Sequence, residues 1–242
     1  MDDYDQIFGD KKTVLVVTAH PDDLDAMCGG TVARLTADGK RVISIKTTTG
    51  NNGSRDSKIS PAFLAKKRQT EDARAMKTLG LDPRDSVNLG FDDGSIENSK
   101  EVVERISYYI RKFQPQIIIT LNPEKILISK QGKTWVNHRD HRNTAAATVD
   151  ATYPFSRDLS FFAKQFDDPK IKPSKCNEIL FADYCPGEKQ VKIKIDDFTG
   201  QKQKALESHA SQFNEEAVKD VMNIYSVKQS DSTFESFRHV SF

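Results

Sequence analysis

The chain has little of what builds a disulfide framework or a membrane anchor. Only three cysteines occur in 242 residues, they form no Cys-x-x-Cys pair, and their odd number argues against a set of structural disulfides. No apolar run approaches the roughly 20 residues that a membrane-spanning helix needs, and the acidic first twelve residues lack the apolar stretch of a signal peptide. We therefore expect a cytoplasmic protein, because few and scattered cysteines fit a reducing compartment.

An excess of charge of either sign is also missing. The chain has 36 Lys and Arg against 35 Asp and Glu, a net charge of +1, and no run of basic residues. This composition gives no general attraction to nucleic acid or to an anionic membrane. The length suits one large α/β domain better than two small ones, so we expect residues 1–242 to form a single domain. A homo-oligomer is left open.

Strand-like and helix-like stretches alternate through the first half of the chain. We expect strands at 13–19, 42–48, 86–89 and 116–121, and helices at 24–38, 61–79 and 100–113. This alternation predicts an α/β fold with a mainly parallel, twisted sheet flanked by helices on both faces. Sites in such sheets lie at the carboxyl ends of the strands.

The second half is less regular. It predicts a helix at 141–151, strands at 178–182 and 191–195, a helix at 198–211 and a further helix from about 214. The segments 123–137 and 153–174 are expected to be irregular and to rim the pocket, because loops carry most of the variation in specificity.

Three of the five histidines lie in two short clusters of metal-ligand type. The first cluster, Ala19-His20-Pro21-Asp22-Asp23, directly follows the apolar stretch 13–18. It therefore places an imidazole and two carboxylates at the carboxyl edge of the sheet. The second cluster, His138-Arg139-Asp140-His141, can add a third ligand and a supporting carboxylate. Three protein ligands with one open position describe a catalytic zinc centre.

Adjacent residues point in different directions, so only one of Asp22 and Asp23 should bind a metal easily. The other can then act as a general base on a water beside the metal. The plainer alternative is that His-Pro-Asp-Asp forms only a well-capped turn at the start of a helix. The presence of both clusters, with the first directly after a buried strand, favours the metal site over that alternative.

Other features have ordinary explanations. The pair Gly29-Gly30 is expected to allow close helix packing rather than to bind phosphate, since no Gly-x-Gly-x-x-Gly occurs. Arg68 and Glu71 could form a solvated ion pair on one helix. The loop 49–54 could hold a ligand or be a simple turn, and Asp92-Asp93-Gly94 is expected to form a turn. Cys28 is expected to be a small buried residue.

Several segments together resemble the PIG-L/LmbE-like metal-dependent deacetylases, a family that includes the GlcNAc-phosphatidylinositol de-N-acetylases. The segments are AHPDDLDAMCGGTVARL (19–35), TTTGNNG (47–53), RQTEDARAMKTLG (68–80), LGFDDG (89–94), HRDHRNTA (138–145) and KALESHASQ (204–212). They span most of the chain, and the first and fifth are the specific ones. The resemblance implies a Rossmann-like α/β fold and hydrolysis of an N-acetyl group, usually on a glucosamine unit.

The resemblance also implies roles for individual residues. His20, Asp23 and His141 look like ligands of Zn²⁺, although Fe²⁺ suits such a set as well. Asp22 looks like the general base, and His138 like the residue that faces the tetrahedral intermediate. Two further roles are implied: Asp140 as the partner that orients His138, and Arg68 as a substrate-binding residue. No role follows for His209.

One departure concerns the residues after the first cluster. Many family members read HPDDE or HPDDxE, whereas this chain has Leu24 and Asp25 at those positions. The ligands are intact, but the contacts around them are less certain. Two rivals stay open: an amidase for a larger acyl or thiol-conjugate amide, and a non-catalytic carbohydrate-binding protein on the same scaffold.

Overall fold

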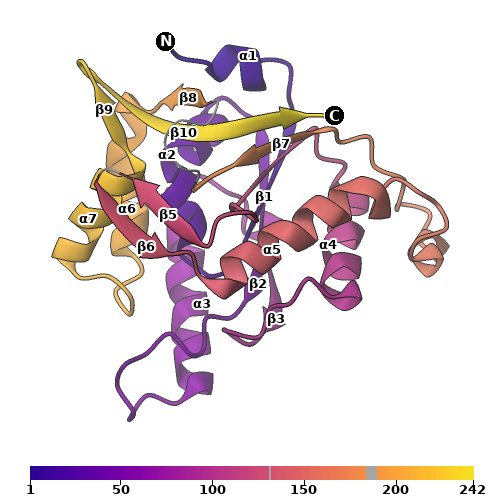
Figure 1. Ribbon diagram of the computed structural model, residues 1–242, viewed down its shortest axis with the longest axis horizontal. Coiled ribbons are helices and arrows are strands. Elements are labelled where there is room, and N and C mark those ends of the chain that lie inside the picture. The colour runs from indigo at the N-terminus through magenta and orange to yellow at the C-terminus, as the bar shows by residue number, and fades with distance from the viewer. Residues whose placement is uncertain (131, 184–189) are drawn as a thin grey trace.

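The computed structural model describes residues 1–130, 132–183 and 190–242. Its main sheet contains β1 (Thr13–Thr18), β2 (Arg41–Thr48), β3 (Ser86–Phe91), β4 (Ile117–Thr120), β7 (Glu178–Phe181), β8 (Val191–Lys194), β9 (Val227–Gln229) and β10 (Ser232–Ser241). The α-helices are α1 (Tyr4–Phe8), α2 (Asp23–Ala37), α3 (Pro61–Thr78), α4 (Lys100–Phe113), α5 (Arg139–Asp150), α6 (Thr199–Glu207) and α7 (Glu215–Tyr225). The strand order is β3-β2-β1-β4-β7-β10-β8, and β9 pairs with β10 (Figure 1).

The predicted α/β fold is confirmed. Strands β3, β2, β1, β4 and β7 run parallel, and within the described part of the main sheet the antiparallel pairs are those that involve β10. The carboxyl ends of the parallel strands therefore meet at one edge of the sheet, where both histidine clusters were expected.

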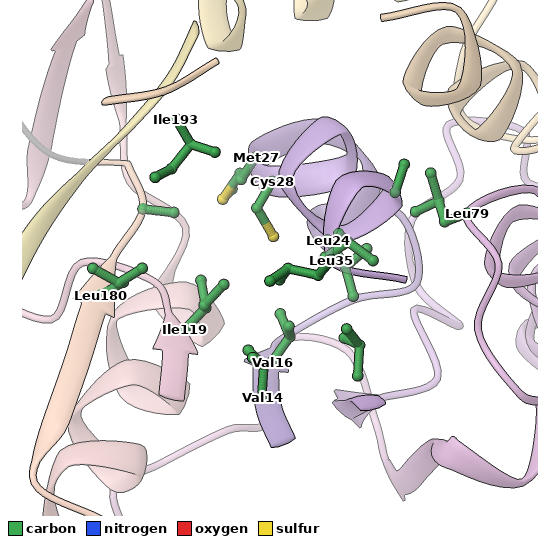
Figure 2. Close-up of a cluster of buried hydrophobic side chains, with 14 of the residues drawn as sticks. Val14, Val16, Leu24, Met27, Cys28, Leu35, Leu79, Ile119, Leu180 and Ile193 are labelled. Carbon is green, nitrogen blue, oxygen red and sulfur yellow. The ribbon is translucent and has the colours of Figure 1, made fainter. Parts of the chain in front are cut away.

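Two hydrophobic cores cover the two faces of the sheet. The side chains of β1 alternate between them: Val14 and Val16 belong to the first core, and Leu15 and Val17 to the second. Figure 2 shows the first core, in which Leu24 and Leu35 of α2 pack over the sheet. Helices α3, α6 and α7 also contribute to this core, whereas α4 and α5 cover the other face. Strands buried on both faces explain the continuous apolar run at 13–18.

Several elements were not predicted from the sequence, among them α1, β5, β6, β9 and β10. Residues 123–137 contain a hairpin of β5 (Leu127–Lys130) and β6 (Lys133–Val136). Burial alternates along β5, but a lysine, Lys130, occupies one of the two buried positions and obscures the pattern in the sequence. The ten-residue strand β10 was missed because Glu235 and Arg238 interrupt its apolar pattern.

In the described part of the chain, no helix is long and apolar enough to cross a membrane.

Helix α2 is broken in its middle, at Cys28, which has φ −144° and ψ 18°. The backbone N–H groups of Gly30 and Thr31 donate to the carboxylate of Glu235 on β10, at 2.9 and 2.7 Å. This carboxylate also pairs with Lys202 of α6 at 2.8 Å, and both side chains are fully buried. A Cβ on Gly30 would lie 2.7 Å from Ile195, so the predicted close packing is confirmed here. The second half of α2 thus starts as a new helix, capped by a distant strand.

Candidate metal centre and active site

The turn between β1 and α2 orients its two aspartates differently. The backbone N–H groups of Ala19 and His20 donate to Oδ2 of Asp23 at 3.0 and 2.8 Å, which leaves Oδ1 free to bind elsewhere. Asp22 has φ 120°, a region that non-glycine residues rarely adopt. Backbone strain of this kind persists where surrounding contacts enforce it. The contacts come from Arg68, whose Nη2 donates to the carbonyl of Pro21 at 2.7 Å and to Oδ2 of Asp22 at 3.0 Å.

His20, Asp23 and His141 bring their ligand atoms together. The Nδ1 of His20 lies 3.2 Å from Nε2 of His141, which is 3.1 Å from Oδ1 of Asp23. Two nitrogens bound at about 2.0–2.1 Å to a tetrahedral ion would lie about 3.3 Å apart. The donor set and its spacing therefore fit a divalent metal ion.

The other nitrogen of His20 is held by two carboxylates. Its Nε2 lies 3.1 Å from Oδ1 of Asp93 and 3.4 Å from Oδ2 of Asp140. A carboxylate that accepts Nε2–H leaves the lone pair of Nδ1 for the metal. Burial alone would lower the pKa of His20, but Asp140, Asp23 and Asp93 outweigh it and hold the pKa well above the usual value. Metal must therefore compete with a proton for this imidazole.

The carboxylate of Asp140 supports His20 rather than His138. It is fully buried and also accepts the backbone N–H groups of Gly94 at 2.6 Å and Ile96 at 3.2 Å. The Nδ1 of His138 instead accepts a hydrogen bond from the backbone N–H of Asp140 at 3.2 Å. The expected side-chain pair of Asp140 with His138 is therefore replaced by a backbone contact.

This contact defines the tautomer of His138. Because Nδ1 accepts, the proton of the neutral ring is on Nε2. Burial lowers the pKa of His138, and the neighbouring His20 and His141 lower it further. The ring, which caps the start of α5, lies edge-on to His20 with centroids 4.9 Å apart. This arrangement gives a neutral N–H donor beside the candidate metal ligands.

Arg68 is mainly a buried support for the turn. Only 3% of its surface is exposed, and besides Pro21 and Asp22 it binds the carbonyl of Gly50 at 3.1 Å. A Cβ on Gly50 would collide with this guanidinium. The expected pair with Glu71 is absent among the described contacts, because Glu71 instead binds the backbone N–H and hydroxyl of Ser211.

The loop 49–54 and the turn after β3 hold each other. Asn51 accepts the backbone N–H of Asp93 at 2.8 Å, and Asn52 donates to its carbonyl at 2.8 Å. The sequence analysis predicted that Asp93 belongs to an ordinary turn. Because Asp93 closely follows the carboxyl end of a parallel strand, its position in the sequence could have indicated that it lies at the site.

A cavity of about 330 Å³ lies over these groups. Except for the buried Asp140, every predicted site residue lines it, together with Asp93 and Gly53. Three lining residues come from the C-terminal part of the chain and were not predicted: Gln212, Phe213 and Tyr225. In this cavity, burial raises the pKa of Asp22 to about 6, and the charge of Arg68 opposes part of the rise.

The two segments expected to rim the pocket do not line this cavity as far as the structure describes them. The hairpin contributes only indirectly: Trp135 packs on Tyr225 with ring centroids 6.3 Å apart. Residues 153–174 instead surround the guanidinium of Arg111, which donates to the carbonyls of Phe155 and Asp158 at 2.7 and 2.9 Å. Arg111 lies near the end of α4 and therefore toward the amino edge of the sheet.

Comparison with known proteins agrees with this geometry. A family model described as PIG-L, GlcNAc-PI de-N-acetylase, matches residues 15–152. The chain belongs to this family. Its residues 15–152 include all the metal-ligand candidates, so the resemblance drawn from the motifs is confirmed.

Several relatives are deacetylases by name. The chain is 28% identical over 212 residues to diacetylchitobiose deacetylase of Thermococcus kodakarensis, covering 86% of this chain and 73% of the relative. It is 26% identical over 212 residues to a probable N-acetyl-alpha-D-glucosaminyl L-malate deacetylase 2 of Bacillus anthracis, covering 84% and 82%. The solved N,N'-diacetylchitobiose deacetylase from Pyrococcus horikoshii superposes with a TM-score of 0.83 at 26% identity, covering 97% and 85%.

Proposed function

We propose that this PIG-L family protein is a zinc-dependent N-deacetylase that hydrolyses the acetamide of an N-acetylglucosamine-type substrate. The observation that carries the proposal is the position of Asp22, which shares one cavity with the His20, Asp23 and His141 trio but is not part of it. A carboxyl with a pKa of about 6 is suited to accept a proton near neutral pH and to return it.

His20, Asp23 and His141 would hold the metal. Two imidazoles and one carboxylate suit Zn²⁺ first and Fe²⁺ second. When bound, such an ion polarises a carbonyl and acidifies a water molecule.

The other residues act on protons and orientation. Asp22 takes a proton from the attacking water and passes it to the leaving amine, which amide cleavage requires because an amide anion leaves poorly. The Nε2–H of His138 donates to the carbonyl oxygen as negative charge develops on it. Arg68 holds Asp22 in its strained conformation and borders the substrate cavity.

The cavity of about 330 Å³ has the size of a small ligand pocket and has room for one sugar with its acetamide. The choice between an acetyl and a larger acyl group is left to the release assay described next. A purely carbohydrate-binding protein would not need a clustered ligand trio beside Asp22.

Acetate release tests the proposal directly. Purified protein should release acetate from N-acetylglucosamine or its conjugates, lose that activity on exhaustive chelation, and regain it with Zn²⁺ or Fe²⁺. Release of butyrate from the N-butyryl sugar at a similar rate would favour the wider amidase. Sugar binding without any acid release would favour the non-catalytic reading.

Two further expectations stay proposals, a single domain over residues 1–242 and a cytoplasmic location, and the oligomeric state stays open. Size-exclusion chromatography with light scattering addresses the last.

A further inference from the structure

The lining of the catalytic cavity includes an apolar wall. The wall consists of four residues that belong to the first hydrophobic core or pack against it: Ala26, Met27, Phe213 and Tyr225. The rest of the lining consists of polar side chains and Gly53. A group that enters this cavity therefore meets the candidate metal ligands and proton-transfer groups together with an apolar surface that the core supports from behind.

Tyr225, the last residue of α7, contributes its ring to the wall but not its hydroxyl group. The hydroxyl donates to Oδ1 of Asp183 at 3.1 Å. Asp183 is only 1% exposed and does not line the cavity. Burial and the negative charge of Asp183 raise the pKa of Tyr225 well above its usual value, so the hydroxyl keeps its proton and its acceptor. The face that Tyr225 offers to the cavity is therefore apolar.

The hairpin β5–β6 holds the same ring from other directions. Trp135 of β6 packs edge-on against it, with ring centroids 6.3 Å apart. The Nζ of Lys130 on β5 lies 4.5 Å from the centroid of the Tyr225 ring. An ion pair of 3.1 Å between Lys133 and Asp220 joins the hairpin to α7, beside which it lies (Figure 1). With these contacts and the hydroxyl bond, the ring has little freedom to turn out of the cavity.

Asp183 fixes the ring from the edge of the sheet. It follows the carboxyl end of β7 by two residues, at the edge where the parallel strands place the other site residues. Its φ of 57° lies in a region that non-glycine residues adopt infrequently. Such a conformation persists where surrounding contacts enforce it, and it often accompanies a functional site.

The acetamide group of the proposed substrate has one part that forms no hydrogen bonds, its methyl group. For the proposed reaction, the carbonyl group and the amide nitrogen have to face the candidate metal ligands, Asp22 and His138. The methyl group is therefore expected against the apolar wall, where its burial is favourable. In a pocket of fixed size, one methylene more or less on the substrate changes kcat/KM by ~10–200-fold.

We propose that Tyr225 is the specificity-determining residue for the acyl group, that its ring closes the cavity to chains longer than acetyl, and that Asp183 is the positioning residue of this ring. The proposal rests on the deacetylase function and adds to it which residue selects the acyl length. The hydroxyl bond to Asp183 prevents the ring from swinging aside for a longer chain.

A series of N-acetyl, N-propionyl and N-butyryl glucosamine tests the role of Tyr225. In the wild type, kcat/KM for the butyryl sugar should be at least about tenfold below that for the acetyl sugar. Tyr225→Leu should raise the butyryl-to-acetyl ratio at least about tenfold, and Tyr225→Phe, which keeps the ring without its hydroxyl bond, should fall between the two. Phe63→Leu is the matched control, because Phe63 is 59% exposed and lines none of the described cavities. Should Tyr225→Leu fail to fold, Tyr225→Met takes its place with the same expected direction.

Two variants of Asp183 separate positioning from a structural role. Asp183→Gly removes the acceptor and accommodates the positive φ, so the butyryl-to-acetyl ratio should rise as in Tyr225→Phe. Asp183→Asn keeps an acceptor oxygen and also tolerates this conformation, so it should retain the wild-type ratio. A lower melting temperature of Asp183→Gly with an unchanged ratio would mean that Asp183 only stabilises the fold, which overturns its positioning role.

Calorimetric binding distinguishes failure of this proposal from failure of the deacetylase function. Affinities for N-acetyl and N-butyryl glucosamine are measured on an Asp22→Asn background, with and without Tyr225→Leu. A gain in butyryl affinity with Tyr225→Leu supports the role of Tyr225 even if the wild type releases no acid, an outcome that overturns the deacetylase function alone. A ratio that Tyr225→Leu leaves unchanged, in release or in binding, overturns the role of Tyr225, while acetate release keeps the function. Absence of both acid release and sugar binding overturns both.

Discussion

Replacing Asp22 by Asn should abolish most of the turnover while leaving the metal centre intact. The two side chains have the same shape, and Asn tolerates positive φ better than most residues, so the strained turn should persist. An amide oxygen at Oδ1 can still accept from Arg68. What Asn cannot do is take a proton, and the loss of one general acid–base group costs ~10²–10⁴-fold in rate.

That factor corresponds to about 2.7–5.5 kcal/mol in the activation barrier. The loss should fall on kcat rather than on KM, because Asp22 acts on the attacking water and the leaving amine. It should not be total, since His138 and the metal ligands remain in place. Steady-state acetate release, metal content by mass spectrometry and thermal melting together give the measurement.

Asp23→Ala is the comparison variant. It removes a ligand atom and the acceptor of two backbone N–H groups, so we expect it to lose metal as well as activity. If Asp22→Asn instead keeps near-wild-type turnover with its metal bound, the base is another residue and the mechanism proposed above is wrong.

Three other predictions follow from the same contacts. The kcat/KM value should rise with pH up to about 6, since Asp22 must be ionised and its pKa is about 6; a pH profile with no acid limb in this range would contradict this. Arg68→Ala removes the charge that opposes the raised pKa, so its acid limb should move to higher pH and its kcat should fall together with any rise in KM, as pH-dependent steady-state kinetics would show. Glu235→Ala should destabilise the fold by about 3–5 kcal/mol in urea unfolding because Lys202 is left buried and unpaired, whereas the exposed Glu216→Ala should change stability by less than ~0.5 kcal/mol.

Local patterns together with the family resemblance were sufficient to predict that the three candidate metal ligands lie together. A buried strand that runs into His-Pro-Asp-Asp, followed by a helix, fixes where His20 and Asp23 point, and the parallel sheet fixes which edge they share. His141 was placed by its cluster and by the family resemblance. The antiparallel addition of β10 was not predictable in the same way, because its burial comes from partners far away in the sequence.

Contacts between distant polar groups were the other limit. Nothing near Asp25 in the sequence indicates that it binds His209, 184 residues later. The position of Asp93 could have been inferred from the strand before it, but its contact with His20 needs the sheet order. Asp140 shows the same limit, since its neighbour in sequence, His138, is not the side chain that its carboxylate supports.

The break in α2 has a consequence for where the protein can be divided. The match to the family ends at residue 152, yet the second half of α2 is capped by Glu235, more than eighty residues further along the chain. A fragment trimmed to the matched region would expose the amides of Gly30 and Thr31 and the core face beneath α6. The turn that carries the candidate ligands His20 and Asp23 begins that same helix, so a shortened protein would be expected to lose the proposed metal site together with its fold. The end of the family match and the folding boundary do not coincide in this molecule.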